Sequence, residues 1–422
     1  MAINRKKIFF SYFPALMACH PNPSSNRKPL PVSLLLCCIF FSTKNILILI
    51  NRYRKPMFRF WLLSALLSAS FSLKAQTAEE NFSLQLHEYL SKAVAPNEPG
   101  MAVLVAKPND YTIFSKGYGL ADMKKLTPVT PKTIFNLGSV SKTFVAFGIL
   151  KLQELGKLSI EDPILKYFPH FKNKSLVKDI RIKHLLSHTS GLPDNRPVES
   201  DSIFFLTAND AQNFAPLLQN ESLLFQPGER FEYSNPAFNG LALIIENVTG
   251  MKWQAYIERL IFNKAGMRTS VITDIEYPQL GVAHGYQKVK DLWQEYDFGE
   301  YPTFCAAGNG GVWSSVEELL KYEEAIEKNS FISRQYTDLS RTVFNPDNWK
   351  NNSTPFIGYS WFILKDASQV TIGHSGDQGG FRAEYWFLPE KKIFFTILAN
   401  GSQDLRLVKK KIIELLLENK LL

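Results

Sequence analysis

Residues 136–150 read NLGSVSKTFVAFGIL, in which a small polar cluster runs directly into an apolar segment. From Thr143 to Leu155 the apolar residues fall almost all round a helix, and Gly156 follows as a natural stop. This pattern predicts a central, buried helix. Because residues three positions apart share one face of a helix, Ser139 and Lys142 can point into one cavity from its first turn.

A serine and a lysine at this spacing can form a nucleophilic pair. A lysine that is kept neutral can take the proton of the serine, and the start of a helix offers free N–H groups where an oxyanion would form. Taken alone the pattern is weak, because Ser-x-x-Lys also occurs at 25–28 and 175–178. A helix cap followed by a surface lysine is the alternative interpretation.

A second motif, Tyr233-Ser234-Asn235, is the only Tyr-x-Asn in the chain and precedes a segment with helical character. A tyrosine hydroxyl can relay protons between a serine, a leaving group and a lysine. An asparagine amide can bind a substrate carbonyl. A buried tyrosine beside an asparagine turn is the alternative for this motif.

A third motif, His374-Ser375-Gly376, is the only His-[Ser/Thr]-Gly and is expected to end a strand. The glycine lets a substrate backbone approach closely, and the N–H of Asp377 can complete an oxyanion hole. His374 can donate a hydrogen bond to an anionic or polar substrate group. A satisfied histidine at a strand end is the alternative.

In this order the three motifs resemble those of the serine β-lactamase and penicillin-binding-protein superfamily, specifically its class C-like branch. The resemblance extends over roughly residues 80–420, because the connecting text is also similar, as in IRIKHLLSHTSGLPD (180–194), FQPGERFEYSN (225–235), GNGGVWSSVEELLKY (308–322) and GYSWFI (358–363). It implies an α/β (α+β) fold of the β-lactamase/transpeptidase type. That fold has a five-stranded antiparallel sheet flanked by helices, plus an all-helical subdomain, with the site between them.

The resemblance also implies roles for the motif residues. Ser139 would be the acylated nucleophile, Lys142 its base partner and Tyr233 a second acid/base. Asn235 would bind the substrate, and the backbone N–H groups of Ser139 and Asp377 would form the oxyanion hole. His374, Ser375 and Gly376 would line the substrate site.

One departure from the family pattern concerns the third motif. True β-lactamases and transpeptidases usually carry Lys-Thr-Gly there, with a permanent positive charge that meets the substrate carboxylate. His374 is mostly neutral near pH 7 unless its pKa is raised. The His form is commoner among relatives that resemble esterases and D-aminopeptidases, so strong β-lactam turnover is not expected, whereas acylation is.

Strand-like segments lie at both ends of the globular part, which predicts one antiparallel sheet assembled from both ends of the chain around a helical insertion. They are 101–107, 111–119, 358–364, 369–374, 381–388 and 391–400. Helices are expected after residue 76, from Pro236 to Gly250, after the Ser315 and Glu318 capping pair, and over 404–420. The irregular stretches 193–230 and 280–310 are of the kind that forms substrate-binding walls.

The basic residues are concentrated at the N-terminus. Of 48 Lys and Arg, 11 lie in residues 1–75, which hold no Asp or Glu, and the other 37 face 39 acidic residues. The globular part therefore lacks the excess of positive charge that is typical of nucleic-acid-binding proteins. A small-molecule or peptide substrate is the expected partner. The oligomeric state stays open.

Two apolar stretches in this N-terminal region, 32–50 and 60–73, resemble membrane or targeting signals. The second follows Met57 and Arg59 and ends at a small residue, so we predict a signal peptide over 57–75, cleaved near Ala75-Gln76, and export to the periplasm or beyond. Residues 1–56 are then an extension upstream of the true start, or an uncleaved membrane anchor. The hydrolase domain is 76–422.

Three of the four cysteines lie before residue 57, which leaves Cys305 alone in the globular part and no intramolecular disulfide there. No cofactor is expected. A metal at His184 and His188 is disfavoured, because no Glu follows the first His as it does in His-Glu-x-x-His.

Other local patterns were weighed against the three motifs. Gly373 to Asp377 lacks the last glycine of a nucleophile elbow, so Ser375 is interpreted as part of the substrate wall. Gly308-Asn-Gly-Gly is interpreted as a tight turn beside the site. Tyr301, Trp313 and Trp361 are candidates for lining a pocket.

The sequence thus predicts an exported serine hydrolase that forms an acyl-enzyme with ester or amide substrates. A D,D-peptidase or D-aminopeptidase acting on cell-wall peptides and a true β-lactamase are the enzymatic alternatives. A non-catalytic binding module that keeps the fold is the alternative from another class. Nothing in a binding role requires Ser139, Lys142 and Tyr233 together, which argues against it.

Overall fold

The computed structural model describes residues 78–197, 201, 204, 207–273, 280–296, 307–350, 353–365 and 369–422. The predicted extension (1–56) and signal peptide (57–75) lie outside the described residues, as does Cys305. Among the helices that are described, none is long and apolar enough to cross a membrane.

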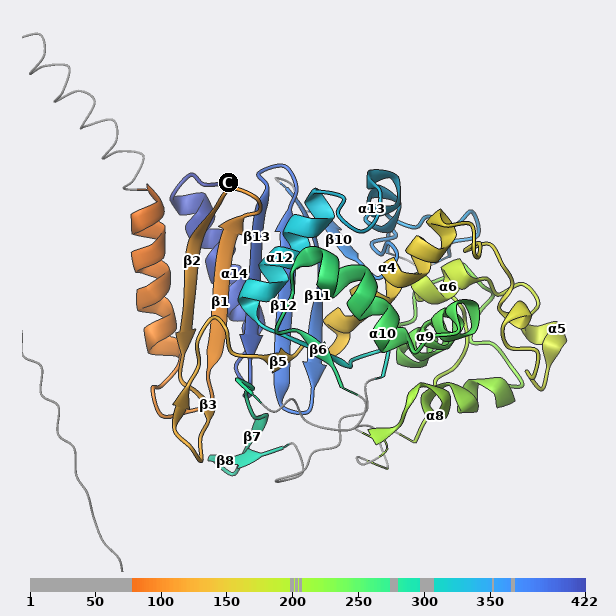
Figure 1. The fold of residues 1–422 in the computed structure, drawn as a ribbon, viewed down its shortest axis with the longest axis horizontal. Helices are drawn as coiled ribbons and strands as arrows, with labels where there is room; N and C mark the ends of the chain where they lie inside the picture. The colour runs from red at the N-terminus through yellow and green to blue at the C-terminus, as the bar shows by residue number, and fades with distance from the viewer. Residues whose placement is uncertain are drawn as a thin grey trace, which may run out of the picture. The chain divides into compact units, whose positions relative to one another are not determined.

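A single antiparallel sheet joins the two ends of the described chain (Figure 1). Its strand order is β10-β11-β12-β13-β1-β2. The central contact pairs β13 with β1, with Met101 opposite Ala399, so residues about 300 positions apart lie side by side. The strands are β1 (Met101–Lys107), β2 (Tyr111–Tyr118), β10 (Phe362–Lys365), β11 (Val370–Gln378), β12 (Phe381–Leu388) and β13 (Ile393–Ala399).

This sheet has six strands, one more than the family resemblance implied, although the strand-like segments in the sequence already numbered six. The edge strand β10 is short and pairs with residues 370–373 of β11. Beyond that point β11 continues through the third motif, where Ser375 pairs with Glu384 and Asp377 with Arg382 of β12. The expectation that His374-Ser375-Gly376 ends a strand is therefore wrong, because pairing with β12 extends the strand to Gln378.

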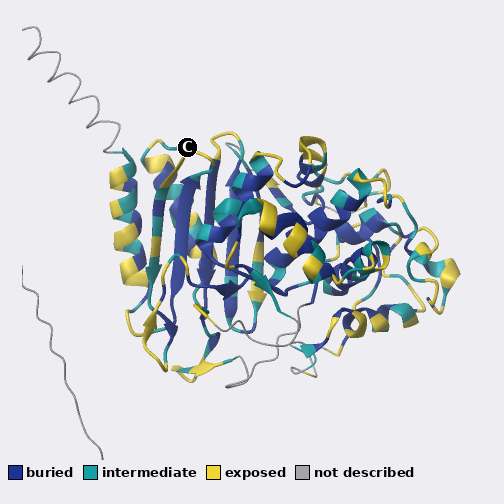
Figure 2. Cartoon of the chain, viewed as in Figure 1, coloured by how far each residue is buried: buried dark blue, intermediate teal, exposed yellow. Residues whose placement is uncertain are grey.

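Both faces of the sheet are buried, and alternate residues of each strand serve the two sides. In β1, Ala102 and Leu104 belong to the core shared with the helical region, whereas Val103 and Val105 belong to a second core. A helix over 78–93 and α14 (Leu405–Glu418) supply much of that second core, through residues such as Phe82, Leu86, Ile412 and Leu416. Figure 2 shows the central strands buried between these layers.

The remaining helices lie mostly between the two groups of strands in the sequence, as expected. They are α4 (Ser141–Glu154), α5 (Lys174–Val177), α6 (Ile182–Leu186), α8 (Asp210–Phe214), α9 (Asn235–Thr249), α10 (Trp253–Ile257), α11 (Asn263–Ala265), α12 (Val316–Glu327) and α13 (Arg334–Ser340). In Figure 1, α5, α6, α8 and α9 gather at the end of the molecule away from β1 and β2. The helix α4 is buried along most of its length, and one core cluster contains residues of α4, of α9 and of the sheet.

The helix ends follow the local sequence signals. Ser234 caps α9 by accepting the Ala237 N–H, and Gly250 ends that helix at φ +68°. Ser315 caps α12 through the Glu318 N–H, but the Glu318 carboxylate bonds the Thr269 N–H, so only half of the expected capping box forms.

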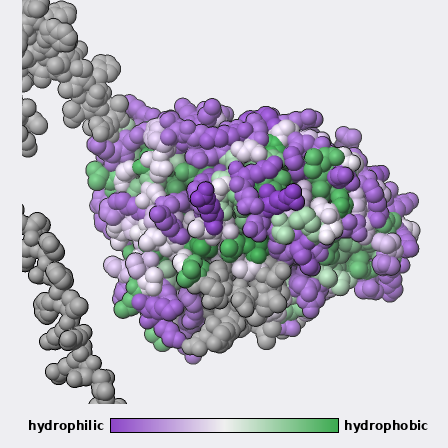
Figure 3. Space-filling view, viewed as in Figure 1, coloured by the Kyte–Doolittle hydropathy of each residue, from purple (hydrophilic) through white to green (hydrophobic). Residues whose placement is uncertain are grey.

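Three small strand groups complete the structure. These are β3 (Leu120–Asp122) with β4 (Thr127–Pro128), β7 (Tyr286–Val289) with β8 (Leu292–Glu295), and β5 (Phe135–Asn136) with β9 (Val312–Ser314) and β6 (Val271–Ile272). The strand β5 leads directly into the segment that carries Ser139. The face of the molecule in Figure 3 is largely hydrophilic, with smaller hydrophobic areas between charged and polar residues.

Candidate active site

Ser139 lies on a single 3₁₀ turn, Gly138–Val140, which runs straight into α4. The preceding residues are fixed by β5, and the Leu137 N–H donates to the Val312 carbonyl of β9. The turn itself is entered through Gly138 at φ +49°, a conformation that suits glycine. The serine is therefore held at the start of a buried helix, as the sequence predicted.

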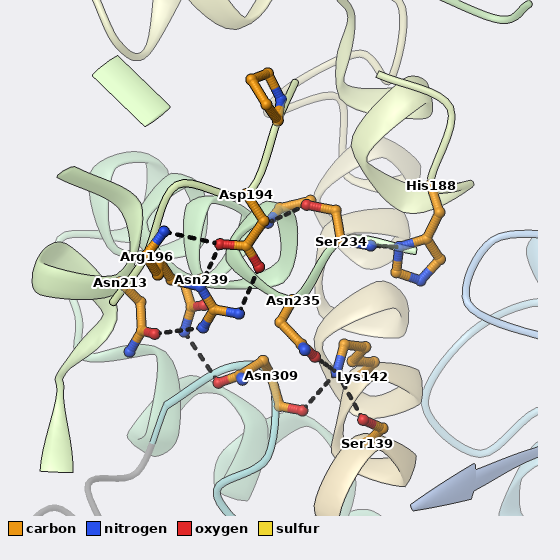
Figure 4. A network of polar contacts seen from close by, with 12 residues as sticks. Ser139, Lys142, His188, Asp194, Arg196, Asn213, Ser234, Asn235, Asn239 and Asn309 are labelled. Carbon is orange, nitrogen blue, oxygen red and sulfur yellow. Dashed lines mark hydrogen bonds and ion pairs between the residues drawn. The ribbon is translucent and has the colours of Figure 1, made fainter. Parts of the chain in front are cut away.

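Lys142 is completely buried one turn further along α4. Its Nζ lies 3.0 Å from Ser139 Oγ, 2.8 Å from Asn235 Oδ1 and 2.7 Å from the Asn309 carbonyl oxygen (Figure 4). Burial lowers the pKa of this amine well below its usual value, and the positive charge of Arg196 lowers it further. A neutral amine is therefore the favoured form.

The three partners of Lys142 determine the direction of its bond to the serine. A neutral amine has two N–H donors and one lone pair. The Asn235 Oδ1 and the Asn309 carbonyl can only accept, so they take both donors. The lone pair is left for the Ser139 O–H, which is the arrangement that proton abstraction requires.

The second motif sits at the start of α9, with Tyr233 just before the Ser234 cap and Asn235 in the first turn. The Tyr233 ring centroid is 5.1 Å from Lys142 Nζ. Burial raises the pKa of the Tyr233 hydroxyl above its usual range, and the nearby Ser139 hydroxyl partly offsets the rise. The tyrosine is therefore protonated at neutral pH.

In the third motif, His374 is almost completely buried and its Nδ1 lies 2.5 Å from the Ser375 carbonyl oxygen. Because that oxygen can only accept, Nδ1 carries the proton. Burial is the main cause that lowers the pKa of His374, to about 3. In the neutral ring with Nδ1 protonated, Nε2 is an acceptor, which disfavours the donor role expected for His374 toward a substrate anion.

The backbones of the first and third motifs touch. A Cβ added to Gly376 would lie 2.1 Å from the Leu137 carbonyl oxygen and 3.1 Å from the Ser139 amide nitrogen. One added to Gly138 would lie 2.8 Å from the Asp377 amide nitrogen. Glycine at both positions therefore brings the Ser139 and Asp377 amides to one spot, which fits the predicted oxyanion hole.

A cleft of about 630 Å³ opens over this constellation. Its wall includes Ser139, Tyr233 and the whole third motif. The described lining residues are Ser139, Tyr233, Phe362, His374, Ser375, Gly376, Asp377, Arg382, Ala383, Glu384, Ser402, Asp404, Leu405 and Arg406. None of them comes from 193–230 or 280–310, parts of which lie outside the described residues, so the prediction that those stretches form substrate walls stays a prediction.

Three residues near the site were missed by the sequence reasoning. Asn309 contributes its carbonyl from the Gly308 turn, which does lie beside the site as predicted. Arg196 is buried and ion-paired to Asp194 at 2.7 Å. His188 stacks on Tyr233 with ring centroids 4.4 Å apart. Of the three, only Asn309 lies in a recognisable local pattern, the glycine-rich turn at Gly308. Arg196 and His188 act through contacts with residues that are distant in the sequence, which no local pattern indicates.

The turn that carries Asn309 is tied to α9 and α10 by a buried carboxylate. Asp210 accepts from the Gly308 N–H at 2.7 Å, from Asn239 Nδ2 at 2.8 Å and from Trp253 Nε1 at 2.8 Å. Asn239 Nδ2 also donates to Asn309 Oδ1 at 3.1 Å (Figure 4). Burial raises the pKa of Asp210 to about 7.

Several features set aside in the sequence are placed by the structure. His184 Nδ1 accepts the Arg181 N–H and His188 Nδ1 accepts the Ser234 N–H. Within the described part of the chain, no group of three or more His, Cys, Asp or Glu could hold a metal ion. Trp313 and Trp361 are wholly buried in the core, so the suggestion that they line a pocket is wrong, and Tyr301 lies outside the described residues.

Comparison with known proteins identifies the family. The family model described as Beta-lactamase matches residues 86–419, and the chain belongs to this family of serine hydrolases. The match describes the family as a whole, so the class C-like branch stays a sequence-based prediction.

Two curated relatives are similar over the same part of the chain. Penicillin-binding protein 4* of Bacillus subtilis is 30% identical over 320 residues, which are 72% of this chain and 68% of the relative. Protein flp of Staphylococcus aureus is 29% identical over 315 residues, which are 72% of this chain and 60% of the relative. The chain thus spans about two thirds or less of these proteins.

Solved structures agree on the fold. An octameric penicillin-binding protein homologue from Pyrococcus abyssi is similar with a TM-score of 0.67 and 28% identity, covering 79% of this chain and 76% of the other. A D-amino acid amidase from Ochrobactrum anthropi SV3, solved with L-phenylalanine amide, has the same TM-score at 19% identity, covering 81% and 99%. The β-lactamase/transpeptidase-like fold expected from the motifs is confirmed.

Proposed function

We propose that this protein hydrolyses ester or amide bonds through an acyl-enzyme on Ser139. The observation that carries the proposal is the position of the buried Lys142 Nζ, 3.0 Å from Ser139 Oγ. Its other two partners, Asn235 Oδ1 and the Asn309 carbonyl, can only accept, so in the neutral amine the lone pair is left for the Ser139 hydroxyl. A merely structural lysine is expected to be charged and exposed, whereas this one is buried and its pKa is lowered well below the usual value, which favours the neutral form.

The residues then have distinct tasks in acylation. Ser139 Oγ attacks the substrate carbonyl carbon while its proton passes to Lys142 Nζ. The amides of Ser139 and Asp377 stabilise the oxyanion, and Tyr233 can deliver its proton to the leaving group while it takes up the proton held by Lys142, which restores both groups. In deacylation a water molecule replaces the leaving group, and its proton returns by the same route to restore Ser139.

Asn235 has a divided role in this scheme. Its Oδ1 is engaged by Lys142, so its Nδ2 is the atom that can donate to a substrate carbonyl. The same side chain thereby orients the base and binds the substrate.

The third motif limits the substrate class. A substrate carboxylate would meet a neutral imidazole whose Nε2 offers a lone pair, and two lone pairs repel. We therefore favour substrates without a carboxylate beside the scissile bond, and a weak rather than efficient β-lactamase activity.

A second candidate is a hydrolase of D-amino acid amides or peptides. The Nε2 acceptor of His374 suits a substrate that carries an N–H donor, and the largely exposed Asp377 carboxylate, paired with Arg382 at 3.3 Å, adds further acceptor oxygens to the same cleft. The amidase among the structural neighbours is named for such substrates, although its low identity supports the fold alone.

The test is intact-mass spectrometry of the protein after incubation with a fluorophosphonate and, separately, with a fluorescent penicillin, followed by peptide mapping. We expect one fluorophosphonate adduct on Ser139 and slower or absent penicillin labelling. Ser139→Ala should abolish the label with the fold unchanged. Ser402→Ala, which removes another hydroxyl from the same cleft at a position with no assigned role, is the matched control and should keep it.

Other outcomes have clear meanings. Rapid labelling of Ser139 by both probes would favour a penicillin-recognising enzyme over the esterase or amidase. Label that survives in Ser139→Ala would show that the nucleophile is another residue. No adduct with either probe would leave the non-catalytic binding module.

A further inference from the structure

His188 lies in the left-handed region of backbone space, at φ +56°. For a residue other than glycine this conformation is strained and persists where the surroundings over-determine it. The side chain is also 1% exposed. The contacts around this buried histidine, next to a catalytic motif, must therefore hold it in the strained conformation.

His188 also packs against the rings of Phe231 and Phe238, but three of its contacts involve Tyr233 or the residues on either side of it. Its carbonyl oxygen accepts the Glu232 N–H at 2.9 Å, and its Nδ1 accepts the Ser234 N–H at 3.0 Å. Its imidazole stacks on the Tyr233 ring, with centroids 4.4 Å apart and planes 25° from parallel. His188 therefore fixes the backbone on each side of the tyrosine and the ring itself.

The tyrosine depends on such support. Its hydroxyl is buried without a direct hydrogen-bond partner among the described residues, although Ser139 is near enough to influence its pKa. Packing and the backbone therefore contribute strongly to the position of the ring. On the same side, the rings of His374 and Tyr233 are 6.3 Å apart, too far for a stack as close as that of His188.

The protonation state of His188 suits this task. Because Nδ1 accepts from a backbone N–H, it must be unprotonated, and the neutral ring carries its proton on Nε2. Burial, with Lys142 and His374 nearby, lowers the pKa of His188 well below its usual value. The acceptor is consequently retained throughout the neutral pH range.

We propose that His188 is a positioning residue for Tyr233. One ring stack and two hydrogen bonds to backbone N–H groups hold the phenol in its position beside Ser139 and Lys142. The proposal rests on the proposed function, because the position of the phenol matters only if Tyr233 moves protons at Ser139. His188 itself touches no reacting atom.

The informative variant is His188→Asn. Asparagine tolerates the left-handed conformation, and its side-chain oxygen can still accept the Ser234 N–H, but it cannot stack on the tyrosine. His184→Asn is the matched control. His184 is buried on α6 four residues earlier, and its Nδ1 likewise accepts a backbone N–H, from Arg181, away from Tyr233.

The assay measures kcat and KM of the full-length protein with a neutral p-nitrophenyl ester, alongside the melting temperature. Since general acid–base groups contribute about 10²–10⁴-fold, we expect His188→Asn to lower kcat by about 10²-fold with KM within about 3-fold. His184→Asn should keep kcat within about 3-fold at a similar melting temperature. If His188→Asn does not fold, His188→Gln is measured in the same way.

A double-mutant cycle separates positioning from general destabilisation. In a Tyr233→Phe background, His188→Asn should cost less than about 2-fold in kcat, because the group it positions is gone. An equal loss of kcat in both backgrounds, or an equal loss of kcat from His184→Asn, would overturn this inference and leave the proposed function standing. A wild-type protein that neither hydrolyses the ester nor labels at Ser139 would overturn the proposed function and the inference with it.

Discussion

Replacing Gly376 by alanine should separate the first and third motifs without touching a side chain of either. The new Cβ would lie 2.1 Å from the Leu137 carbonyl oxygen, where ordinary contacts begin at 3.4 Å. The two backbones must therefore move apart by roughly 1 Å, because the Leu137 carbonyl oxygen is a main-chain atom and the new Cβ is fixed to the main chain, so neither can rotate away. The Asp377 amide moves with β11, away from the Ser139 amide.

The expected cost follows from that displacement. Loss of one oxyanion donor, or a misplacement of about 1 Å, lowers kcat by on the order of 10²–10³-fold. Overpacking at the same time destabilises the fold by about 1–3 kcal/mol. We expect a folded protein with a lower melting temperature, nearly unchanged KM and kcat down by about 10²-fold or more, measured with a p-nitrophenyl ester.

Gly117→Ala is the matched control for this experiment. Its Cβ would lie 2.2 Å from the Val129 carbonyl oxygen, a clash of the same size and kind, but on β2 at the far edge of the sheet. Its melting temperature should fall while kcat stays within about 3-fold. The reasoning is refuted if Gly376→Ala keeps wild-type kcat, or if Gly117→Ala loses as much.

Three other predictions concern charge and processing. Arg196→Met should raise the pKa of Lys142, since a positive neighbour is removed, and should move the acidic limb of the kcat/KM profile to higher pH. Arg196→Lys keeps the charge and should leave that limb in place. The same profile for both variants would show that the charge of Arg196 does not affect the pKa of Lys142. His374→Lys should increase the acylation rate with a carboxylate-bearing penicillin relative to a neutral ester by about 10-fold or more if charge is what the third motif lacks, whereas a loss would mean that the shape of the cleft decides. N-terminal sequencing of the exported protein should begin near Gln76, and a mature chain that begins upstream of Met57 would contradict the predicted signal peptide.

The elements that the sequence predicted well are those encoded locally. The buried α4 follows from apolar residues on every side of the helix, and the cap of α9 follows from Ser234 and Gly250. The sheet was predicted from alternating strands at both ends of the chain. The third motif was placed at the end of a strand predicted over 369–374, whereas pairing with β12, which no local pattern encodes, carries the strand on to Gln378.

The sequence by itself determined which residues carry the chemistry, because Ser139, Lys142 and Tyr233 are recognised by spacing, order and residue type. Only the tertiary structure decided their protonation states and the directions of their hydrogen bonds. The Asn309 carbonyl, 167 residues from Lys142, takes the N–H that leaves the lone pair for the serine, and burial together with Arg196 keeps that amine neutral. The Ser375 carbonyl fixes the tautomer of His374, and the support of Tyr233 by His188 exists only after folding. Protonation and hydrogen-bond direction depend on desolvation and on partners distant along the chain, and neither is written in a local pattern of residues.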